Sequence, residues 1–256
     1  MPWLTGKVYL VGAGPGSSDL LTVRAAEILK RADIVFHDAL VYPDTLRLAT
    51  AALKIAVGKR CGRYATAQKF INKRLVDAAR RFKTVVRLKG GDPMLFGRAQ
   101  EEIAALQAAG VAYEVVPGVT AAAAASAELG VSLTRRGVSR NVVFVTPRNG
   151  AGETVHDWAA SVVAADTAVI YMGSGQAASI AERLISRGLP PATPAVVVEN
   201  ASLPQRRTIK LTLSELPEIA ELAMEGPATI MLGEVFAAVE ENASSLFPQP
   251  VLAAVR

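Results

Sequence analysis

The sequence has 256 residues, of which 51% are hydrophobic and 20% charged, with a formal net charge of +5. This composition excludes an intrinsically disordered chain, which would combine low hydrophobicity with a high net charge. A single cysteine, Cys61, and only two histidines exclude an internal disulfide and a cysteine-rich or histidine-rich metal centre, so we predict no metal.

Short β-branched runs alternate with amphipathic helical segments along the first half of the chain. We expect five strands there, over residues 7–11, 33–36, 55–57, 84–88 and 113–116. Helical spacing begins at Leu21, with Ser18 or Asp19 as the expected cap, and recurs over about 67–81 and 98–109. Strands that alternate with helices predict a parallel sheet covered on both faces.

A second series of strands follows Pro117-Gly118 and an alanine-rich helix over 120–129. Its strands are expected over residues 141–146, 167–172, 195–199, 206–211 and 228–232, with helices over about 174–187 and 214–224. The fourth strand follows the third too closely for a helix between them, so we predict an antiparallel pair. We therefore predict an α/β fold with a mostly parallel first sheet and a mixed second sheet. The expected limits are an N-terminal domain over 1–119, a C-terminal domain over 120–242 and an irregular tail over 243–256.

Glycine-rich loops follow two of the predicted strands, at the end of a parallel sheet where ligands commonly bind. In the loop over 12–16 (GAGPG), Pro15 lacks an amide that a phosphate would use, and Ser17 stands where a dinucleotide fingerprint needs glycine. Gly90-Gly91 allows positive φ angles and close approach of a ligand to the main chain. The adjacent Asp92 can accept hydrogen bonds from hydroxyl or ammonium groups. Each loop can equally be a structural turn, with Asp92 as its cap.

Polar side chains also follow the second and third strands. Asp38 and Lys59 lie at carboxyl-terminal strand ends that share one edge of the predicted sheet. A carboxylate and an amine there can move protons if burial and neighbouring charges shift their pKa values. A structural ion pair and two solvated charges are the alternative interpretations. Thr120 and Met172 follow other strands, where a helix cap and core packing are the simplest roles.

The positive charge is concentrated in the first part of the chain. Residues 1–150 hold 22 basic and 11 acidic side chains, and the remainder holds 6 basic and 12 acidic. Several basic residues gather in the loops: Lys59, Arg60, Arg63, Lys89, Arg98, Arg135, Arg136, Arg140 and Arg148. This pattern suits a small polycarboxylate partner, although a solvated surface would also explain it. Aromatic residues are scarce and no apolar stretch or secretory leader is present, so we expect a cytoplasmic protein that binds neither nucleic acid nor membrane.

Taken together, these motifs resemble the tetrapyrrole methylase family of S-adenosylmethionine-dependent methyltransferases over about residues 6–240. The resemblance rests on VYLVGAGPG (8–16), LLTVR (20–24), ADIVFHDALV (32–41), VGKR (57–60), RLKGGDPMLFGR (87–98), VVPGVTAA (115–122), YMG (171–173) and PATIMLGE (227–234). Within the family, the combination of RLKGGDP with HDALV and VGKR most resembles the branch that C-methylates uroporphyrinogen III.

The resemblance implies two α/β domains with S-adenosyl-L-methionine in the cleft between them, usually in a homodimer. It assigns cofactor contacts to Pro15, Gly90, Gly91, Asp92, Leu95, Thr120, Ala121, Met172, Ala201 and Ala228. The proton acceptor and donor of the family fall on Asp38 and Lys59. The implied reaction methylates uroporphyrinogen III, which carries eight carboxylates, at two pyrrole carbons. It gives precorrin-2 for sirohaem and cobalamin biosynthesis, with S-adenosyl-L-homocysteine as the second product.

The chain departs from the family pattern at four places. Ala99-Gln100 stands where many relatives have two glycines, Arg135 and Arg148 each replace a histidine, and Ala201-Ser202 replaces Gly-Thr. Three of the four departures follow residue 130 and bear on the substrate more than on the cofactor. The two added arginines favour an anionic substrate. The alternatives are a methyltransferase for a later corrin intermediate, an RNA methyltransferase of the same fold and a non-catalytic nucleotide-binding module.

Overall fold

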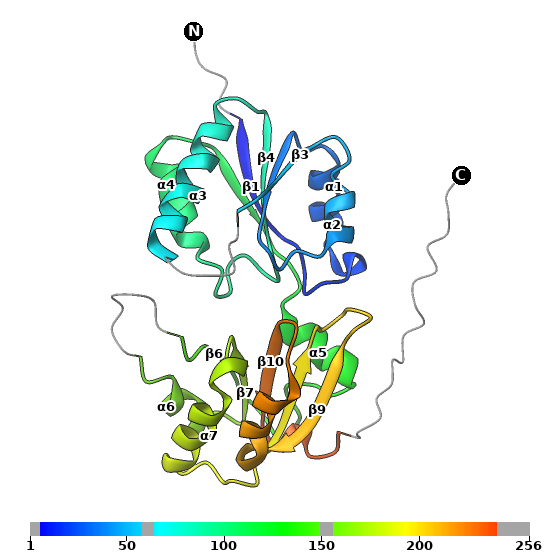
Figure 1. The fold of residues 1–256 in the computed structure, drawn as a ribbon, viewed down its shortest axis with the longest axis vertical. Helices are drawn as coiled ribbons and strands as arrows, with labels where there is room; N and C mark the ends of the chain where they lie inside the picture. Colours follow the sequence, from blue (N-terminus) through cyan, green and yellow to red (C-terminus); the bar gives the residue numbers. More distant parts are fainter. Residues whose placement is uncertain (1–5, 58–63, 149–155, 240–256) are drawn as a thin grey trace, which may run out of the picture. The chain divides into compact units, whose positions relative to one another are not determined.

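The computed structural model describes residues 6–57, 64–148 and 156–239 of the chain (Figure 1). The chain divides into two compact units, Met1–Ala121 and Ala122–Arg256. Each unit is built on one five-stranded sheet. The tail expected over 243–256 lies outside the described residues, and the domain limits at 119 and 242 stay a prediction.

The first unit contains a parallel sheet with the strand order β3-β2-β4-β1-β5. Every pairing in it is parallel, so the parallel arrangement predicted from the alternating pattern is confirmed. Both faces of such a sheet are buried, which explains why its strands read as nearly continuous apolar runs. The strands are β1 (Lys7–Gly12), β2 (Ile34–His37), β3 (Leu53–Ala56), β4 (Thr84–Lys89) and β5 (Tyr113–Val116).

Helices cover both faces of this sheet. Helices α1 and α2 lie on one side and α3 and α4 on the other (Figure 1). Separate apolar clusters fill the two interfaces, with Val35 and Val86 on the α1 side and Phe36 and Val85 on the α3 side. The helices are the 3-10 helix η1 (Ser18–Leu20), α1 (Val23–Lys30), α2 (Pro43–Arg47), α3 (Tyr64–Ala79) and α4 (Ala99–Ala108).

Two details of the first unit differ from the sequence-based expectation. The cap of α1 is Thr22, whose Oγ1 accepts a hydrogen bond from Ala25 N at 3.1 Å, and not Ser18 or Asp19. Those two residues belong instead to the separate turn η1. Helix α2 was not expected, because five residues are too few to display a helical period.

The second unit contains a mixed sheet with the strand order β6-β7-β10-β8-β9. Strands β6 and β7 pair in parallel, and the other three pairings are antiparallel. The predicted antiparallel pair of neighbouring strands is β8 with β9, and it is confirmed. The strands are β6 (Val142–Val145), β7 (Thr167–Tyr171), β8 (Pro194–Glu199), β9 (Arg207–Thr212) and β10 (Ala228–Leu232).

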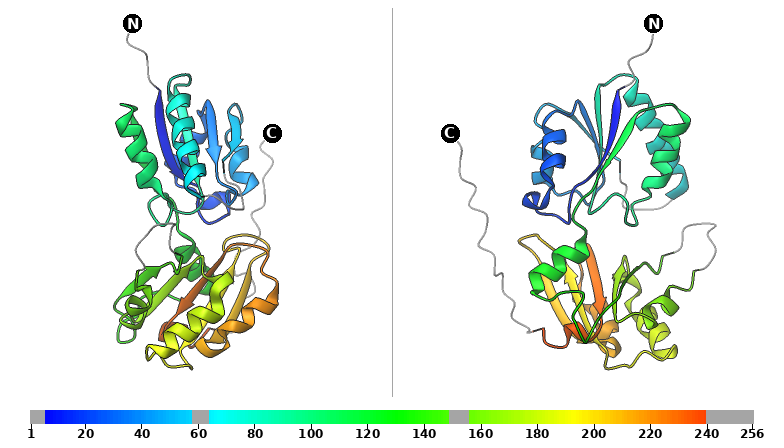
Figure 2. Two further views of the ribbon diagram at one scale, coloured as in Figure 1. Left: turned by 60° about the vertical axis from the view of Figure 1, so that its left-hand side comes forward. Right: turned by 180° about the vertical axis from the view of Figure 1, so that it is seen from behind.

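The helices of the second unit lie on both faces of its sheet. Helices α6, α7 and η3 share one apolar core with the sheet, and α5 covers the opposite face (Figure 2). The helix expected over 214–224 is a 3-10 helix that contains Pro217, which has no amide to donate. The elements are α5 (Ala121–Leu129), α6 (Trp158–Val163), η2 (Ser174–Gln176), α7 (Ala177–Ser186), η3 (Leu213–Leu222) and η4 (Glu234–Phe236).

Glu114 at the start of β5 joins the first sheet to α1 through surface ion pairs. Its carboxylate lies 2.6 Å from Lys7 Nζ and 2.5 Å from Arg24 Nη2. The hydrogen bond from Lys7 lowers the pKa of Glu114 below its ordinary value of 4.5. Because the folded-state pKa of Glu114 is lower than its pKa in the unfolded chain, the ion pairs stabilise the fold fully at pH values above the unfolded-state pKa. Their contribution is lost as the pH falls through the folded-state pKa.

We therefore expect Glu114→Gln to reduce the free energy of unfolding by about 1 kcal/mol or less at pH 7, since the pairs are partly exposed to solvent. Urea unfolding at pH 7 and at pH 3.5 measures the effect. The difference between the variant and the unchanged chain should shrink at the lower pH. An equal difference at both values would show that Glu114 acts through packing and not through its charge.

Candidate active site

Three loops meet at the carboxyl-terminal edge of the first sheet. Gly91 N donates to Gly14 O over 2.7 Å, and Gly14 N donates back to Gly91 O over 3.3 Å, so the loops after β4 and β1 are bridged. The loop after β5 packs against both. A Cβ atom placed on Gly118 would lie 2.3 Å from Gly91 O and 2.9 Å from Gly12 Cα. The three loops therefore approach one another so closely that there is no room for a side chain at position 12 or 118.

Gly91 combines this contact with an open side. Its φ is +67°, a conformation that favours glycine, and a Cβ atom built on it would meet nothing within 4 Å. The main chain after β4 is thus accessible to a ligand on the side where a side chain would stand. This open cradle fits the expectation that Gly90 and Gly91 contact a cofactor through their backbone.

Asp92 fastens the loop after β4 to the loop after β5. Its Oδ2 accepts from Gly118 N over 2.9 Å, and its Oδ1 accepts from Met94 N over 2.8 Å. The structural role that the sequence left open is therefore present. Each carboxylate oxygen has a second lone pair, so a ligand contact by Asp92 is compatible with these bonds and stays a prediction.

The other expected cofactor residues of the first unit lie along the same loops. Pro15 follows the bridged Gly14, and Leu95 N donates to Asp92 O over 3.3 Å. Thr120 and Ala121 stand where the chain leaves β5 and begins α5. All four positions are half-buried.

Asp38 lies directly after β2 and is held by the neighbouring strand β4. Its backbone amide donates to Leu88 O over 3.2 Å, and its Oδ1 accepts from Arg87 Nη2 over 2.5 Å. The Asp38 side chain is 29% exposed, whereas that of Arg87 is 3% exposed. Although burial opposes it, the carboxylates of Asp38 and Glu102 raise the pKa of Arg87. Lys59, the expected proton donor, lies outside the described residues.

The expectation that the basic loop residues are available to an anionic partner is wrong for Lys89. The sequence places it among side chains available to an anionic partner, yet it is buried and donates to Glu102 Oε2 over 3.1 Å. Burial, and then the nearby charge of Arg87, lower the pKa of Lys89. Arg98 is also engaged, because its Nε donates to Glu101 Oε1 over 2.6 Å. Glu102, which holds both buried cations, was not identified from the sequence.

In the second unit, three expected cofactor residues lie at one end of neighbouring strands. Met172 follows β7, Ala228 begins β10 and Ala201 follows β8, and these strands are adjacent in the sheet. The bond from Asn200 N to Pro227 O, 2.9 Å long, joins the last two segments. Met172 has a φ of +56° and is 40% exposed, whereas Ala201 is 6% exposed. The topology thus brings these three positions to one edge.

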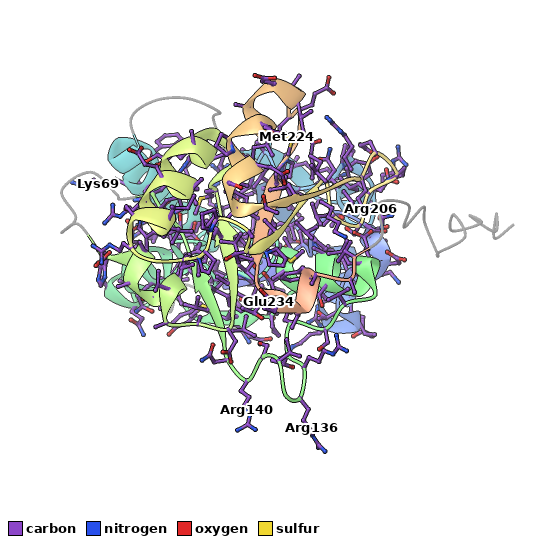
Figure 3. The ribbon with its side chains drawn as sticks, turned by 90° about the horizontal axis from the view of Figure 1, so that it is seen from below. Lys69, Arg136, Arg140, Arg206, Met224 and Glu234 are labelled. Atoms are coloured by element: carbon purple, nitrogen blue, oxygen red, sulfur yellow. The ribbon has the colours of Figure 1, made fainter. Side chains whose placement is uncertain are left out.

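A second group of basic residues lies between α5 and β6. Arg135, Arg136 and Arg140 are exposed, and Figure 3 shows Arg136 and Arg140 extending outward from this loop. The loop is closed by an isolated bridge between Arg135 and Ser139. Arg148, after β6, is exposed as well. These arginines present fixed positive charge at the surface of the second unit.

Within residues 6–57, 64–148 and 156–239, no three His, Cys, Asp or Glu side chains gather closely enough to hold a metal ion. In the same part of the chain, no helix has the length and apolar character that crossing a bilayer requires.

Residues 7–217 match the family of tetrapyrrole (corrin/porphyrin) methylases. The chain belongs to this family. It is 45% identical over 232 residues to a siroheme synthase of Chromobacterium violaceum. This match covers 90% of the chain and 49% of the siroheme synthase. A siroheme synthase of Tolumonas auensis is 43% identical over 233 residues, 50% of its length. This tetrapyrrole methylase thus spans about half the length of the curated relatives that it matches.

Solved structures match this tetrapyrrole methylase over nearly their whole length. The uroporphyrin-III C-methyl transferase of Thermus thermophilus, solved with S-adenosyl homocysteine, is 40% identical with a TM-score of 0.79, covering 90% of this chain and 98% of that one. A cobalt precorrin-4 methyltransferase is 27% identical with the same TM-score, covering 90% and 95%. The expected two-domain α/β fold of the family is confirmed.

Proposed function

We propose that this tetrapyrrole methylase is an S-adenosylmethionine-dependent C-methyltransferase that converts uroporphyrinogen III to precorrin-2. The observation that carries the proposal is the 40% identity to a uroporphyrin-III C-methyl transferase over 98% of that protein's chain. The product would serve sirohaem and cobalamin biosynthesis. The proposal covers the methyl transfer and no other reaction of the longer siroheme synthases.

S-adenosyl-L-methionine supplies, when bound, a methyl group on a sulfonium that a nucleophilic carbon can attack. We assign its binding to the main chain of Gly90 and Gly91, which is open on the Cβ side of Gly91, with Asp92 fixing the turn. Pro15, Leu95, Thr120 and Ala121 are the proposed further contacts from the first unit. Met172, Ala201 and Ala228 are the proposed contacts from the second unit. The chain's main task is alignment and exclusion of water, which displacement reactions chiefly require.

Asp38 is the proposed proton acceptor. After methyl transfer the alkylated ring must lose a proton, and a carboxylate at the end of β2 can receive it. Arg87 holds that carboxylate in one orientation. Lys59 stays the proposed donor or carboxylate anchor. The exposed arginines Arg135, Arg136, Arg140 and Arg148 supply charge that suits a substrate with eight carboxylates.

The methylation of a later corrin intermediate is the second candidate. It is favoured by the equal TM-score of the cobalt precorrin-4 methyltransferase, although that protein is less similar in sequence. The two candidates differ in the substrate loops and share the cofactor loops, so substrate choice decides between them.

Anaerobic incubation of the purified chain with uroporphyrinogen III and S-adenosylmethionine tests the proposal. Mass spectrometry should detect a tetrapyrrole that has gained two methyl groups. No gain with uroporphyrinogen III, together with methylation of a precorrin-4 type substrate, would replace the first candidate by the second. Retention of RNA that weakens steeply with salt would instead favour an RNA substrate.

We also propose a homodimer located in the cytoplasm, in keeping with the family resemblance. Light scattering coupled to gel filtration tests the assembly, for which we expect twice the chain mass of 26.9 kDa.

A further inference from the structure

The core layer under α3 and α4 changes from apolar to charged near the carboxyl-terminal ends of β2 and β4. Side chains alternate between the two faces of a sheet, so every second residue shares a face. On β2, Phe36 belongs to this core, and Asp38 follows it two residues later. On β4, Val85 belongs to the same core, followed by Arg87 and Lys89. The register pairs Phe36 with Arg87, which brings the two charged ends side by side.

Helices α3 and α4, which cover this face, also bury polar side chains beside the charged ends of β2 and β4. Helix α4 buries Ala99, Ile103 and Leu106 in the core, and Glu102 lies in the same helical stripe. The Glu102 side chain is 0% exposed. Helix α3 contributes Gln68, which is also buried. A charged cluster thus continues the apolar core to the edge where the loops meet.

Glu102 is the centre of this cluster. Its Oε1 accepts from Arg87 Nε over 2.9 Å and from Gln68 Nε2 over 3.2 Å. Its Oε2 accepts from Lys89 Nζ over 3.1 Å. With Asp38 on the far side of Arg87, two carboxylates face two cations. Such a balance is what makes burial of the charges tolerable, because an unpaired buried ion is very costly.

Arg87 connects Glu102 to Asp38. Its guanidinium donates through Nε to Glu102, through Nη2 to Asp38 over 2.5 Å and through Nη1 to Leu88 O over 3.2 Å. A planar guanidinium with all three nitrogens engaged has one orientation. The Asp38 carboxylate is therefore the partly exposed end of a chain of bonds whose other members are buried.

We propose that Glu102 is a positioning residue for methyl transfer, which orients the Asp38 carboxylate by fixing the Arg87 guanidinium. This inference rests on the proposed catalytic role of Asp38. Rigid support of this kind matters because small displacements of a reacting group cost large factors in rate. Glu102 acts from inside the helix–sheet interface and has no part in binding the cofactor.

The experiment is a double-mutant cycle on kcat, measured by steady-state kinetics with mass-spectrometric detection. Glu102→Gln keeps the side-chain size but replaces charge-assisted bonds by weaker neutral ones, and its single oxygen cannot serve all three donors. We expect kcat to fall about tenfold or more, with unchanged affinity for S-adenosylhomocysteine in calorimetry. In an Asp38→Asn background, Glu102→Gln should change kcat by less than about twofold, because the group that it positions is gone.

A purely structural role of Glu102 predicts a different result, namely the same loss of kcat in both backgrounds. That result, or a kcat within twofold of the unchanged chain in Glu102→Gln alone, would overturn the inference. Glu114→Gln is the matched control, since it removes a glutamate with two ion pairs near the amino-terminal end of β5. It should leave kcat unchanged.

A second variant covers the case in which Glu102→Gln does not fold. Combining Glu102→Leu with Lys89→Met removes one charge of each sign and keeps the cluster balanced. Circular dichroism and cofactor-product binding establish that it is folded, and the same tenfold loss and the same dependence on Asp38 are expected. If the chain without any substitution methylates no uroporphyrinogen III, the proposed function and this inference are overturned together. An active chain with equal losses in both backgrounds would overturn this inference alone.

Discussion

Replacing Asp38 by alanine should reduce kcat for methylation of uroporphyrinogen III by about 10²- to 10⁴-fold, the usual contribution of a positioned general base. Binding of S-adenosylhomocysteine should persist, because the loops at Gly14, Gly91 and Gly118 are held by main-chain contacts that do not involve Asp38. Steady-state kinetics with mass detection and calorimetric titration measure the two quantities separately.

A matched control for this variant is Asp44→Ala on α2. Asp44 is a partly exposed aspartate that pairs with Arg47 over 2.9 Å, so its loss removes a carboxylate of the same type from the same unit. Its kcat should stay within twofold of the unchanged chain. Wild-type turnover in Asp38→Ala would remove Asp38 from the mechanism. A loss of cofactor-product binding in that variant would show that its effect is on the loops and not on proton transfer.

The second large effect is expected at Gly118. An alanine there would place its Cβ 2.3 Å from Gly91 O, which belongs to main chain that the hydrogen bonds to Gly14 hold in place. We expect the free energy of unfolding to fall by about 2–3 kcal/mol, because an added group in a packed region forces the backbone to move. The affinity for S-adenosylhomocysteine should fall as well, since the displaced loop is the one that carries Gly91.

Gly110→Ala is the control for Gly118→Ala. Gly110 has a φ of +66° but open space where a Cβ would stand, so alanine there costs only conformational strain of about 1 kcal/mol. Urea unfolding should therefore rank Gly118→Ala as the more destabilising change, with cofactor-product affinity reduced in that variant alone. The opposite ranking would mean that backbone conformation, and not the contact between loops, makes glycine necessary at the edge of the sheet.

Much of the fold could be predicted because its strands are strongly patterned and are separated by turn residues. Strands with β-branched runs, such as β4 and β10, were expected within one residue of their observed limits. Short elements were missed, since α2 and α6 have five and six residues and show no period. The conformation over 213–222 was also missed, because Pro217 within it favours a tighter helix than the periodic pattern suggests.

The site could be predicted in part. Glycines after strands, and a carboxylate after β2, indicated the right edge of the sheet because parallel strands end together. The partners of Asp92 and Lys89 could not be predicted, since they depend on which loop and which helix cover the strand end. A signal for Glu102 was present: a charged residue lies within the apolar stripe of Ala99, Ile103 and Leu106, and Arg87 interrupts an apolar strand. Because a buried charge needs a partner of opposite sign, an acidic and a basic residue that both occupy core positions are expected to pair.

We propose that the main chain after β4 holds the methyl donor beside a carboxylate that Arg87 fixes. A crystal structure of the chain with S-adenosylhomocysteine tests it most directly. We expect ligand density against the backbone of Gly90, Gly91 and Asp92, on the open side of Gly91, with the bond between Arg87 and Asp38 retained. Ligand density away from Gly91, or an Asp38 side chain turned from Arg87 in the complex, would contradict it.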